Sequence, residues 1–374
     1  MKINKDNILK YVTIVFFLGF IFIFPIINFL TPDKKINEME NKILSQSPDF
    51  SLGKVYNGSF MKDFDSYTSD QFPFRTEFIE FKNYYNYGIG HKEFRDIYVS
   101  NSGRLMEKFV FNKDIIDKNI AQVIDVSCYL KDNYSVSSTI MIVPTSIAFY
   151  ENDLPGYAIT DNQLNALKYI NSEIDAYKVQ NYNIKLYSPY SILEKNKNEY
   201  IYFNTDHHWT QLGAKLAFED LYGEVTGDYS KISDNFYGTY YSKALLPQIK
   251  GDTIFSYDDY KDFDILIDFD KNYDTLYNDT KLNGKNKYQY FLHGDPALAV
   301  IEGNPNSIDE ILVYKDSYAH NFVPFLTSKY KKIHVIDPRY YKLNIDDYFS
   351  KNKDIKDVLF LNNISTFNSS DIIK

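Results

Sequence analysis

Residues 202–215 read YFNTDHHWTQLGAK, and they bring together side chains that can do acid–base chemistry. The chain has six histidines, and two of them, His207 and His208, stand between Asp206 and the single tryptophan, Trp209. The apolar IYFN that leads into this stretch is expected to be extended, and residues two apart in an extended segment share a face. Asp206 and His208 can then meet as the orienting acid and the general base of a nucleophilic triad. His207 is expected to point the other way, toward the sheet or the substrate.

Two other interpretations of this segment compete with a triad. A metal site is disfavoured because the side chains of adjacent histidines diverge, no HExxH-type spacing is present, and Cys128 is the only cysteine. We therefore expect no metal and no cofactor. The structural alternative is a buried polar cluster, in which Asp206 and His208 tie a loop to the sheet.

The nucleophile that a triad needs is supplied by ILVYKDSYAH, where Ser317 follows a short apolar strand over residues 311–314. Open parallel sheets place their sites outside the carboxyl ends of the strands. YAHNFVPFL reads as a helix after the serine, and backbone N–H groups at a helix N-terminus can stabilise an oxyanion. The alternative is an N-cap serine, which this position also favours. Asp316 is interpreted as a residue that holds the turn.

The elements that must position these residues alternate between strands and helices. Short apolar runs predict buried parallel strands, and apolar residues at three- and four-residue intervals predict helices. The alternation predicts an α/β fold with a mostly parallel sheet flanked by helices. Residues 229–305 are expected to form a β-rich insertion over one end of the sheet. The expected strands are 139–144, 183–189, 311–314, 331–337 and 357–363, and the expected helices are 112–130, 164–177 after a capping box at 160–163, 211–222 and 344–351.

An uncharged apolar stretch occupies residues 11–30, YVTIVFFLGFIFIFPIINFL. At 1.5 Å rise per residue it spans about 30 Å, the thickness of a bilayer core. A signal peptide usually has a shorter apolar core and a small-residue cleavage site, and neither is present. We therefore expect an uncleaved single-pass anchor in the cell membrane, with residues 1–10 in the cytoplasm.

The rest of the chain is expected to lie outside the cell, although the lysines that flank the apolar stretch are nearly balanced and do not fix the orientation. Residues 31–59 are polar and are expected to form a stalk. The catalytic domain is expected to occupy residues 60–374, and it begins with a helical pattern that is broken at Pro73.

Composition narrows the class of partner. A net charge of −9 without a basic block argues against nucleic acid. The 35 Tyr and 29 Phe suit stacking on sugars, although an AT-rich genome encodes the same residues. Trp209 is accordingly interpreted as either a sugar platform or a packing residue.

TDHHWT (205–210) resembles the signature of the bacterial DHHW-motif family, which is similar to the alginate O-acetyltransferase proteins of the SGNH-hydrolase-like superfamily. Two positions depart from the family pattern. Lys315 stands where a glycine usually precedes the Asp-Ser pair, and His293-Gly294-Asp295 stands where a Gly-Asn pair is expected. The resemblance runs from about residue 60 to the C-terminus, and its other pieces are SDQFPFR (69–75), NSGRLME (101–107), IVPTSIAFYENDLP (142–155), YGTYYSKA (237–244), YQYFLHGDPALAVIEG (288–303) and KDSYAHNFVPFL (315–326).

The resemblance implies an SGNH-hydrolase-like fold and gives three residues their roles: Ser317 is the nucleophile, His208 the general base and Asp206 the orienting acid. It also implies work outside the cell on a cell-envelope or matrix polysaccharide. The acetyl donor is then supplied by a polytopic membrane-bound O-acyltransferase. The candidates for lining the substrate site are Trp209, His207, Tyr318, Asn321 and His293, with His320 as a further one.

The expected function is transfer of an acetyl group to a sugar hydroxyl through an acetyl-serine intermediate. If water accepts the acetyl group instead, the same residues make a carbohydrate acetylesterase. A non-catalytic assembly factor that binds polysaccharide or a synthase is the alternative from another class.

Overall fold

The computed structural model describes residues 5–177 and 182–373, and the chain divides into two compact units. One unit combines the residues up to 91 with residues 242–248, and the other combines residues 92–241 with residues 249–374. The predicted stalk and the first helices of the predicted catalytic domain therefore fall in the same unit. The predicted domain boundary at residue 60 stays a prediction.

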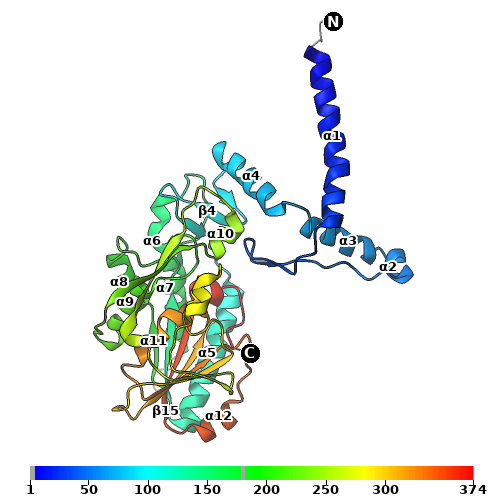
Figure 1. Cartoon of the computed structure of the whole chain (residues 1–374). Helices are drawn as coiled ribbons and strands as arrows, with labels where there is room; N and C mark the ends of the chain where they lie inside the picture. The colour runs from blue at the N-terminus through cyan, green and yellow to red at the C-terminus, as the bar shows by residue number, and fades with distance from the viewer. Residues whose placement is uncertain (1–4, 178–181, 374) are drawn as a thin grey trace. The chain divides into compact units, whose positions relative to one another are not determined.

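The first unit begins with the long apolar helix α1 (Figure 1). Its segment Ile8–Leu30 has a mean hydropathy of 2.5 and is long enough to cross a bilayer. Helices α3 and α4 lie on either side of Pro73, where the sequence predicts a break. The elements of this unit are α1 (Lys5–Leu30), the antiparallel pair β1 (Ile36–Asn37) and β2 (Lys42–Ile43), α2 (Leu52–Tyr56), α3 (Ser59–Asp70) and α4 (Arg75–Gly88).

The second unit is built on a large sheet. Within the described residues this sheet has eight strands, in the order β11-β10-β12-β14-β13-β15-β6-β7. The strands from β14 to β7 are parallel, and β12, β10 and β11 add an antiparallel edge. The strands are β6 (Ser137–Val143), β7 (Ile184–Tyr187), β10 (Ile265–Ile267), β11 (Lys271–Tyr273), β12 (Leu298–Glu302), β13 (Glu310–Lys315), β14 (Lys332–Ile336) and β15 (Ile355–Asn363).

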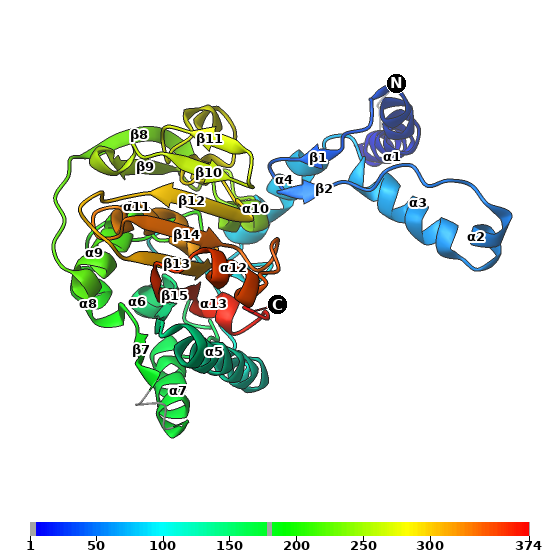
Figure 2. The ribbon, with the colours of Figure 1, turned by 90° about the horizontal axis from the view of Figure 1, so that it is seen from below.

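Both faces of this sheet are covered, as Figure 2 shows from below. Successive residues of a strand point to opposite faces. In β13, Ile311 and Val313 pack with α9 and the insertion, whereas Leu312 and Tyr314 pack with α5 and α7. The covering helices are α5 (Lys113–Tyr134), α7 (Gln163–Ala176), α8 (Tyr190–Lys195), α9 (Gln211–Tyr222), α11 (Val323–Leu326), α12 (Ile345–Lys351) and α13 (Ile364–Phe367).

Smaller elements surround the large sheet. They comprise a meander of β3 (Glu93–Phe94), β4 (Ile97–Val99) and β5 (Leu105–Glu107), the pair β8 (Tyr229–Phe236) and β9 (Asp252–Tyr257), and the short helices α6 (Ile147–Tyr150) and α10 (Thr239–Ala244). The predicted α/β class with a mostly parallel sheet, an N-terminal apolar helix and a β-rich insertion is confirmed.

Four local expectations are corrected. The helix α7 has Asn162 as its N-cap, and the side chain of Asn162 accepts from Asn165 N. The predicted capping box placed the N-cap two residues earlier, at residue 160. The insertion does not only cover the sheet, because β10, β11 and β12 extend it. Residues 201–204 form no strand and make one antiparallel bridge, Tyr202 to Trp209. The segment after Ser317 is a 3₁₀ turn followed by the four-residue α11, not one helix.

Candidate active site

The DHHW segment is a tight turn that returns on itself just before α9. Tyr202 and Trp209 form the bridge at its base, where Thr210 N also donates to Ile201 O at 2.9 Å. Thr210 then caps α9 and accepts from Gly213 N. A Cβ on Gly213 would lie 2.5 Å from Ile201 O, so the first turn of α9 packs against the incoming chain. The acid and both imidazoles are therefore held at the tip of a braced turn.

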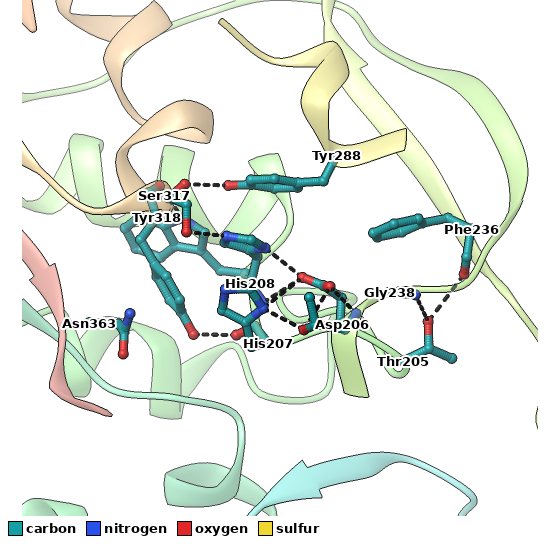
Figure 3. A network of polar contacts seen from close by, with 12 residues as sticks. Thr205, Asp206, His207, His208, Phe236, Gly238, Tyr288, Ser317, Tyr318 and Asn363 are labelled. Carbon is teal, nitrogen blue, oxygen red and sulfur yellow. Dashed lines mark hydrogen bonds and ion pairs between the residues drawn. The ribbon is translucent and has the colours of Figure 1, made fainter. Parts of the chain in front are cut away.

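Three predicted residues meet at this tip in the order acid, imidazole, hydroxyl (Figure 3). Asp206 Oδ1 lies 2.5 Å from His208 Nδ1, and His208 Nε2 lies 2.7 Å from Ser317 Oγ. Asp206 also accepts from the backbone N–H of His208 at 3.0 Å. Asp206 and His208 are buried, whereas Ser317 is partly exposed. In this arrangement the imidazole can take the hydroxyl proton while the carboxylate fixes its tautomer.

The electrostatics of the pair favour a neutral imidazole. Burial and the neighbouring His207 lower the pKa of His208 to about 3, although the Asp206 carboxylate acts in the opposite direction. Burial alone would raise the pKa of Asp206, but His207 and His208 hold it well below its usual range. An ionised acid beside a neutral imidazole is the resting state that a general base requires.

The second histidine faces the same carboxylate, so the expectation that His207 points away is wrong. The two rings lie 3.7 Å apart, and His207 Nδ1 is 3.4 Å from Asp206 Oδ1. The reason is the turn, since side chains alternate only in an extended segment. His207 Nδ1 also lies 2.7 Å from Thr239 Oγ1. Its side chain is 28% exposed, so the imidazole remains accessible beside the Asp206 carboxylate.

These residues could also hold a metal ion by proximity alone. One ligand atom each from Asp206, His207 and His208 lies within 4.8 Å of the others. Proximity is not a ligand set, however, because Asp206 Oδ1 already bonds directly to His208 Nδ1 and its other oxygen accepts from Thr239 N at 2.7 Å. An ion would have to break these hydrogen bonds.

Three hydrogen bonds besides that of His208 to Ser317 tie the serine segment to the DHHW turn. Tyr318 donates from its hydroxyl to His207 O, Trp209 Nε1 donates to Tyr318 O at 2.9 Å, and Asn321 Nδ2 donates to Trp209 O at 2.9 Å. Tyr318 and Asn321, predicted as substrate contacts, are buried where the serine segment packs against the DHHW turn. Trp209 has 0% exposure and stacks on Phe322. A fully buried ring offers no face to a sugar, so the packing alternative for Trp209 holds.

The turn that carries the nucleophile is fixed by Asp316. Its Oδ1 accepts from Tyr318 N at 2.9 Å, and its Oδ2 accepts from both the backbone and the side chain of Asn363 at 2.7 Å. Asn363 ends β15, which neighbours β13 in the sheet. Ser317 is therefore positioned by two adjacent strands, beyond the carboxyl end of β13, and it starts the turn rather than capping it.

Lys315, which replaces the expected glycine, is buried in an ionic network. Its Nζ lies 2.9 Å from Asp337 Oδ2 and 2.9 Å from His320 Nε2. Arg339 donates to the same carboxylate at 2.6 and 2.8 Å. Burial, and after it the charge of Lys315, holds the pKa of His320 well below its usual value. The lysine thus gains a partner for its charge, and a flexible glycine is not required before Asp316.

His293 was predicted as a substrate contact, and the structure gives it other neighbours. Its Nε2 lies 2.9 Å from Thr275 O, and its ring stacks on Tyr273 at 4.0 Å. Burial lowers the pKa of His293. Its substrate role stays a prediction, and the contacts place it with the insertion.

Sequence reasoning missed Tyr288. Its ring stacks on His208 with centroids 3.6 Å apart and an angle of 10°, and its hydroxyl donates to Ser317 O at 2.9 Å. It therefore holds the base and the nucleophile together (Figure 3). The piece YQYFLHGDP contains this tyrosine, but a run rich in aromatic residues gives no signal that singles it out.

Gly238 and Thr239 were also missed. Thr239 donates to Asp206 Oδ2 from its backbone N–H at 2.7 Å and from its hydroxyl at 3.2 Å. Gly238 N donates to Thr205 Oγ1 at 3.2 Å. A Cβ on Gly238 would lie 2.2 Å from both Cβ and Oδ2 of Asp206. The absence of a side chain there lets Thr239 reach the acid.

A half-buried arginine and a buried aspartate brace the chain that enters the turn. Arg104 donates to the carbonyls of Tyr202 and Phe203 at 3.2 and 3.1 Å. Asp252 accepts from the backbone N–H groups of Asn204 and Thr205 at 2.8 and 2.7 Å. Arg104 belongs to the segment NSGRLME (101–107), and the structural role of this segment is to hold the DHHW turn.

Comparison with known proteins identifies the family. A family model described as DHHW protein matches residues 90–336, about two thirds of the chain. The chain belongs to the DHHW family. Among curated proteins, no sequence matches this chain significantly.

Solved structures of another DHHW family protein and of PatB1 share the fold of this chain. A DHHW family protein from Eubacterium siraeum is 23% identical, covers 74% of this chain and 92% of its own, and gives a TM-score of 0.60. PatB1 from Bacillus cereus is 19% identical, covers 74% of this chain and 98% of its own, and gives a TM-score of 0.59. A second structure of PatB1 carries a sulfonyl adduct. The O-acetyltransferase domain of Pseudomonas putida AlgJ is more distant, with 14% identity over 73% of this chain and 92% of its own and a TM-score of 0.44.

Proposed function

We propose that this DHHW protein is an extracytoplasmic O-acetyltransferase that acts on a cell-envelope or matrix polysaccharide. The observation that carries the proposal is the continuous chain of contacts from Asp206 through His208 to Ser317. Membership of the DHHW family supports the proposal, and the reaction class is supported by the resemblance that the TDHHWT motif and its accompanying segments bear to alginate O-acetyltransferase proteins. The apolar helix α1 supports attachment to a membrane.

In the proposed first step, His208 takes the proton of Ser317 Oγ as that oxygen attacks the carbonyl carbon of an acetyl donor. The donor's leaving group departs with the proton from His208, and an acetyl-serine remains. Because the N–H of Tyr318 already donates to Asp316, we assign the N–H of Ser317 as a donor to the oxyanion. Asp206 stays ionised and stabilises the imidazolium.

In the proposed second step, a sugar hydroxyl gives its proton to His208 and attacks the acetyl-serine. The intermediate collapses with loss of Ser317 Oγ, which takes the proton back from His208, so the products are the O-acetylated sugar and free Ser317. His207, which is partly exposed beside the same carboxylate, is proposed as a contact for the incoming sugar. We propose that a membrane-bound O-acyltransferase supplies the acetyl group, with no nucleic acid, metal or cofactor involved.

Transfer is tested with the full chain in detergent, a small acetyl ester as donor, and a panel of oligosaccharides, with products followed by mass spectrometry. Ser317→Ala removes the proposed nucleophile, and Ser350→Ala, on the exposed face of α12, is the matched control. Acetylated sugar from wild type and the control but not from Ser317→Ala is the expected result. Free acetate without acetylated sugar, again dependent on Ser317, would favour the esterase. Equal behaviour of all three proteins would favour the non-catalytic alternative.

A further inference from the structure

Helix α4 exposes an apolar stripe that the proposed reaction does not use. The stripe consists of Phe78, Phe81 and Tyr85 within α4, and the exposed residues that flank the helix, Phe74 before it and Ile89 after it, extend the stripe at both ends. Their exposed fractions lie between 44% and 71%. Residues at intervals of three and four line one face of a helix. A continuous apolar face of this length is rare on the surface of a soluble protein and indicates an interaction surface.

The opposite face of α4 packs inside the first unit, so the orientation of the stripe is fixed. Thr76 Oγ1 accepts from Asn37 Nδ2 at 2.8 Å, and Asn83 Nδ2 donates to Ala244 O at 2.8 Å. Tyr87 lies on this face as well and is half-buried. The stripe therefore points away from the rest of its unit.

The stripe is continuous with the apolar surface of α1. Phe24 of α1 lies 5.8 Å from Phe78, ring centre to ring centre, and stacks on Phe72 at 5.3 Å and 10°. Phe20 also contacts Phe72 at 6.3 Å. The stripe at Phe78, and Phe72 just before it, thus pack against α1, the helix that is long enough to cross a bilayer.

The position of Phe24 along α1 indicates what the stripe contacts. Phe24 lies six residues before Leu30, the end of α1, which is about 9 Å along a helix axis. An amphipathic helix in a membrane interface buries its apolar face about 5–10 Å into the boundary between headgroups and acyl chains. We propose that α4 lies in the interface of the bilayer that α1 enters, with its stripe facing the lipid, as a second membrane contact.

The charge of α4 indicates the kind of lipid interaction. Its polar positions carry Arg75 and Lys82 against Glu77 and Glu80, so the helix has no net charge. Insertion should therefore rest on apolar burial, and it should need neither anionic lipid nor low salt.

The proposal is tested by placing a tryptophan in the stripe. The full chain is reconstituted into phosphatidylcholine vesicles whose acyl chains carry bromine at a shallow or a deep position, and flotation confirms that it is in the membrane. Phe81→Trp and Tyr85→Trp report from the stripe, and Tyr87→Trp, on the packed face, is the matched control. The native Trp209 is buried in the other unit and gives a constant background.

Shallow bromine should quench the two stripe reporters at least twofold more than the Tyr87→Trp control, with an emission maximum shifted to the blue. The quenching should persist in 1 M salt and in vesicles without anionic lipid. Unquenched, water-like emission from both stripe reporters in chain that floats with the vesicles would overturn the proposal, and the stripe would then be a site for another membrane protein. Quenching that requires anionic lipid would overturn the apolar mode of binding.

Discussion

The contact between Gly238 and Asp206 gives the sharpest test of how the site is assembled. In Gly238→Ala the new Cβ would lie 2.2 Å from both Cβ and Oδ2 of Asp206. An ordinary van der Waals contact begins at 3.4 Å, so one of the two segments must give by 3.4 − 2.2 = 1.2 Å. Asp206 Oδ1 is only 2.5 Å from His208 Nδ1, and a shift of this size takes the pair out of hydrogen-bond range.

The loss of activity can be bracketed from this displacement. A misplacement of about 1 Å at a catalytic group costs about 100-fold in rate. Complete loss of the orienting carboxylate in a serine triad costs about 10,000-fold. We expect Gly238→Ala to lower kcat/KM for a small acetyl ester by between about 100-fold and 10,000-fold, while the unfolding free energy falls by about 1–3 kcal/mol from overpacking.

The assay measures acetate release by wild type, Gly238→Ala and Asp206→Asn. The matched control is Gly156→Ala, since a Cβ on Gly156 meets nothing within 4 Å. The control should retain both activity and thermal stability. Wild-type kcat/KM in a folded Gly238→Ala protein would show that Asp206 can move without consequence for the reaction, and so does not orient His208.

Four further predictions follow from the contacts of His208 and of the Lys315 network. Burial and His207 lower the pKa of His208 to about 3, so the base is neutral throughout the mildly acidic range. The value of kcat/KM at pH 5 should therefore stay near the value at neutral pH. An enzyme whose base had the ordinary pKa of about 6.5 would retain only about 3% of its kcat/KM at pH 5. His207→Gln removes one cause of this lowering and should move the acid limb of the pH profile upward. Tyr288→Phe keeps the ring on His208 and should lower kcat/KM about fivefold, the equivalent of one neutral hydrogen bond, and Tyr288→Leu should lower it further. Asp337→Asn leaves the buried Lys315 without its carboxylate and should lower the unfolding free energy by about 3–5 kcal/mol, measured by urea titration. Lys315→Met removes the buried charge itself and should lower the unfolding free energy less. Equal losses in the two variants would argue against the network.

The low pKa of His208 also has a consequence for stability. The imidazole is neutral in the folded chain down to about pH 3, whereas in the unfolded chain it binds a proton below its ordinary pKa of about 6.5. The unfolded state therefore gains protons first, and His208 contributes a loss of folding stability as the pH falls below about 6.5. Activity lost at acidic pH should thus be separated from unfolding by a melting curve at each pH.

Local patterns were sufficient to predict the central elements. Apolar runs located β6, β7, β13, β14 and β15, and three- and four-residue periodicity located the helices α5, α7 and α9, because these signals depend on neighbours in the chain. The position of Ser317 followed from a serine after a buried strand, whereas Asp206 and His208 were paired from a two-residue spacing in an extended segment, and the structure joins them within a turn instead. These are the parts of the site that the sequence encodes locally.

The rest of the site depends on contacts between distant segments. Tyr288 and Gly238 act through approach distances that no local pattern records, and both lie in short, irregular pieces of the insertion. The direction of His207 was wrong because alternation was applied to residues that turn. Trp209 was open between packing and a sugar platform because burial of a single ring depends on the partner surface, here Tyr318 and Phe322.

The site of covalent acetylation shows most directly whether Ser317 is the nucleophile. The full chain is incubated briefly with an acetyl ester, quenched in acid and digested with trypsin, and fragment spectra are read for the peptide of residues 316–329, which follows Lys315 and ends at Lys329. This peptide also contains Tyr318, Thr327 and Ser328, so the fragments must locate the acetyl group. We expect one acetyl group on Ser317, absent in Ser317→Ala and reduced in Asp206→Asn. Acetylation that is unchanged in Ser317→Ala, or that never appears on Ser317 while acetate is released, would exclude Ser317 as the nucleophile.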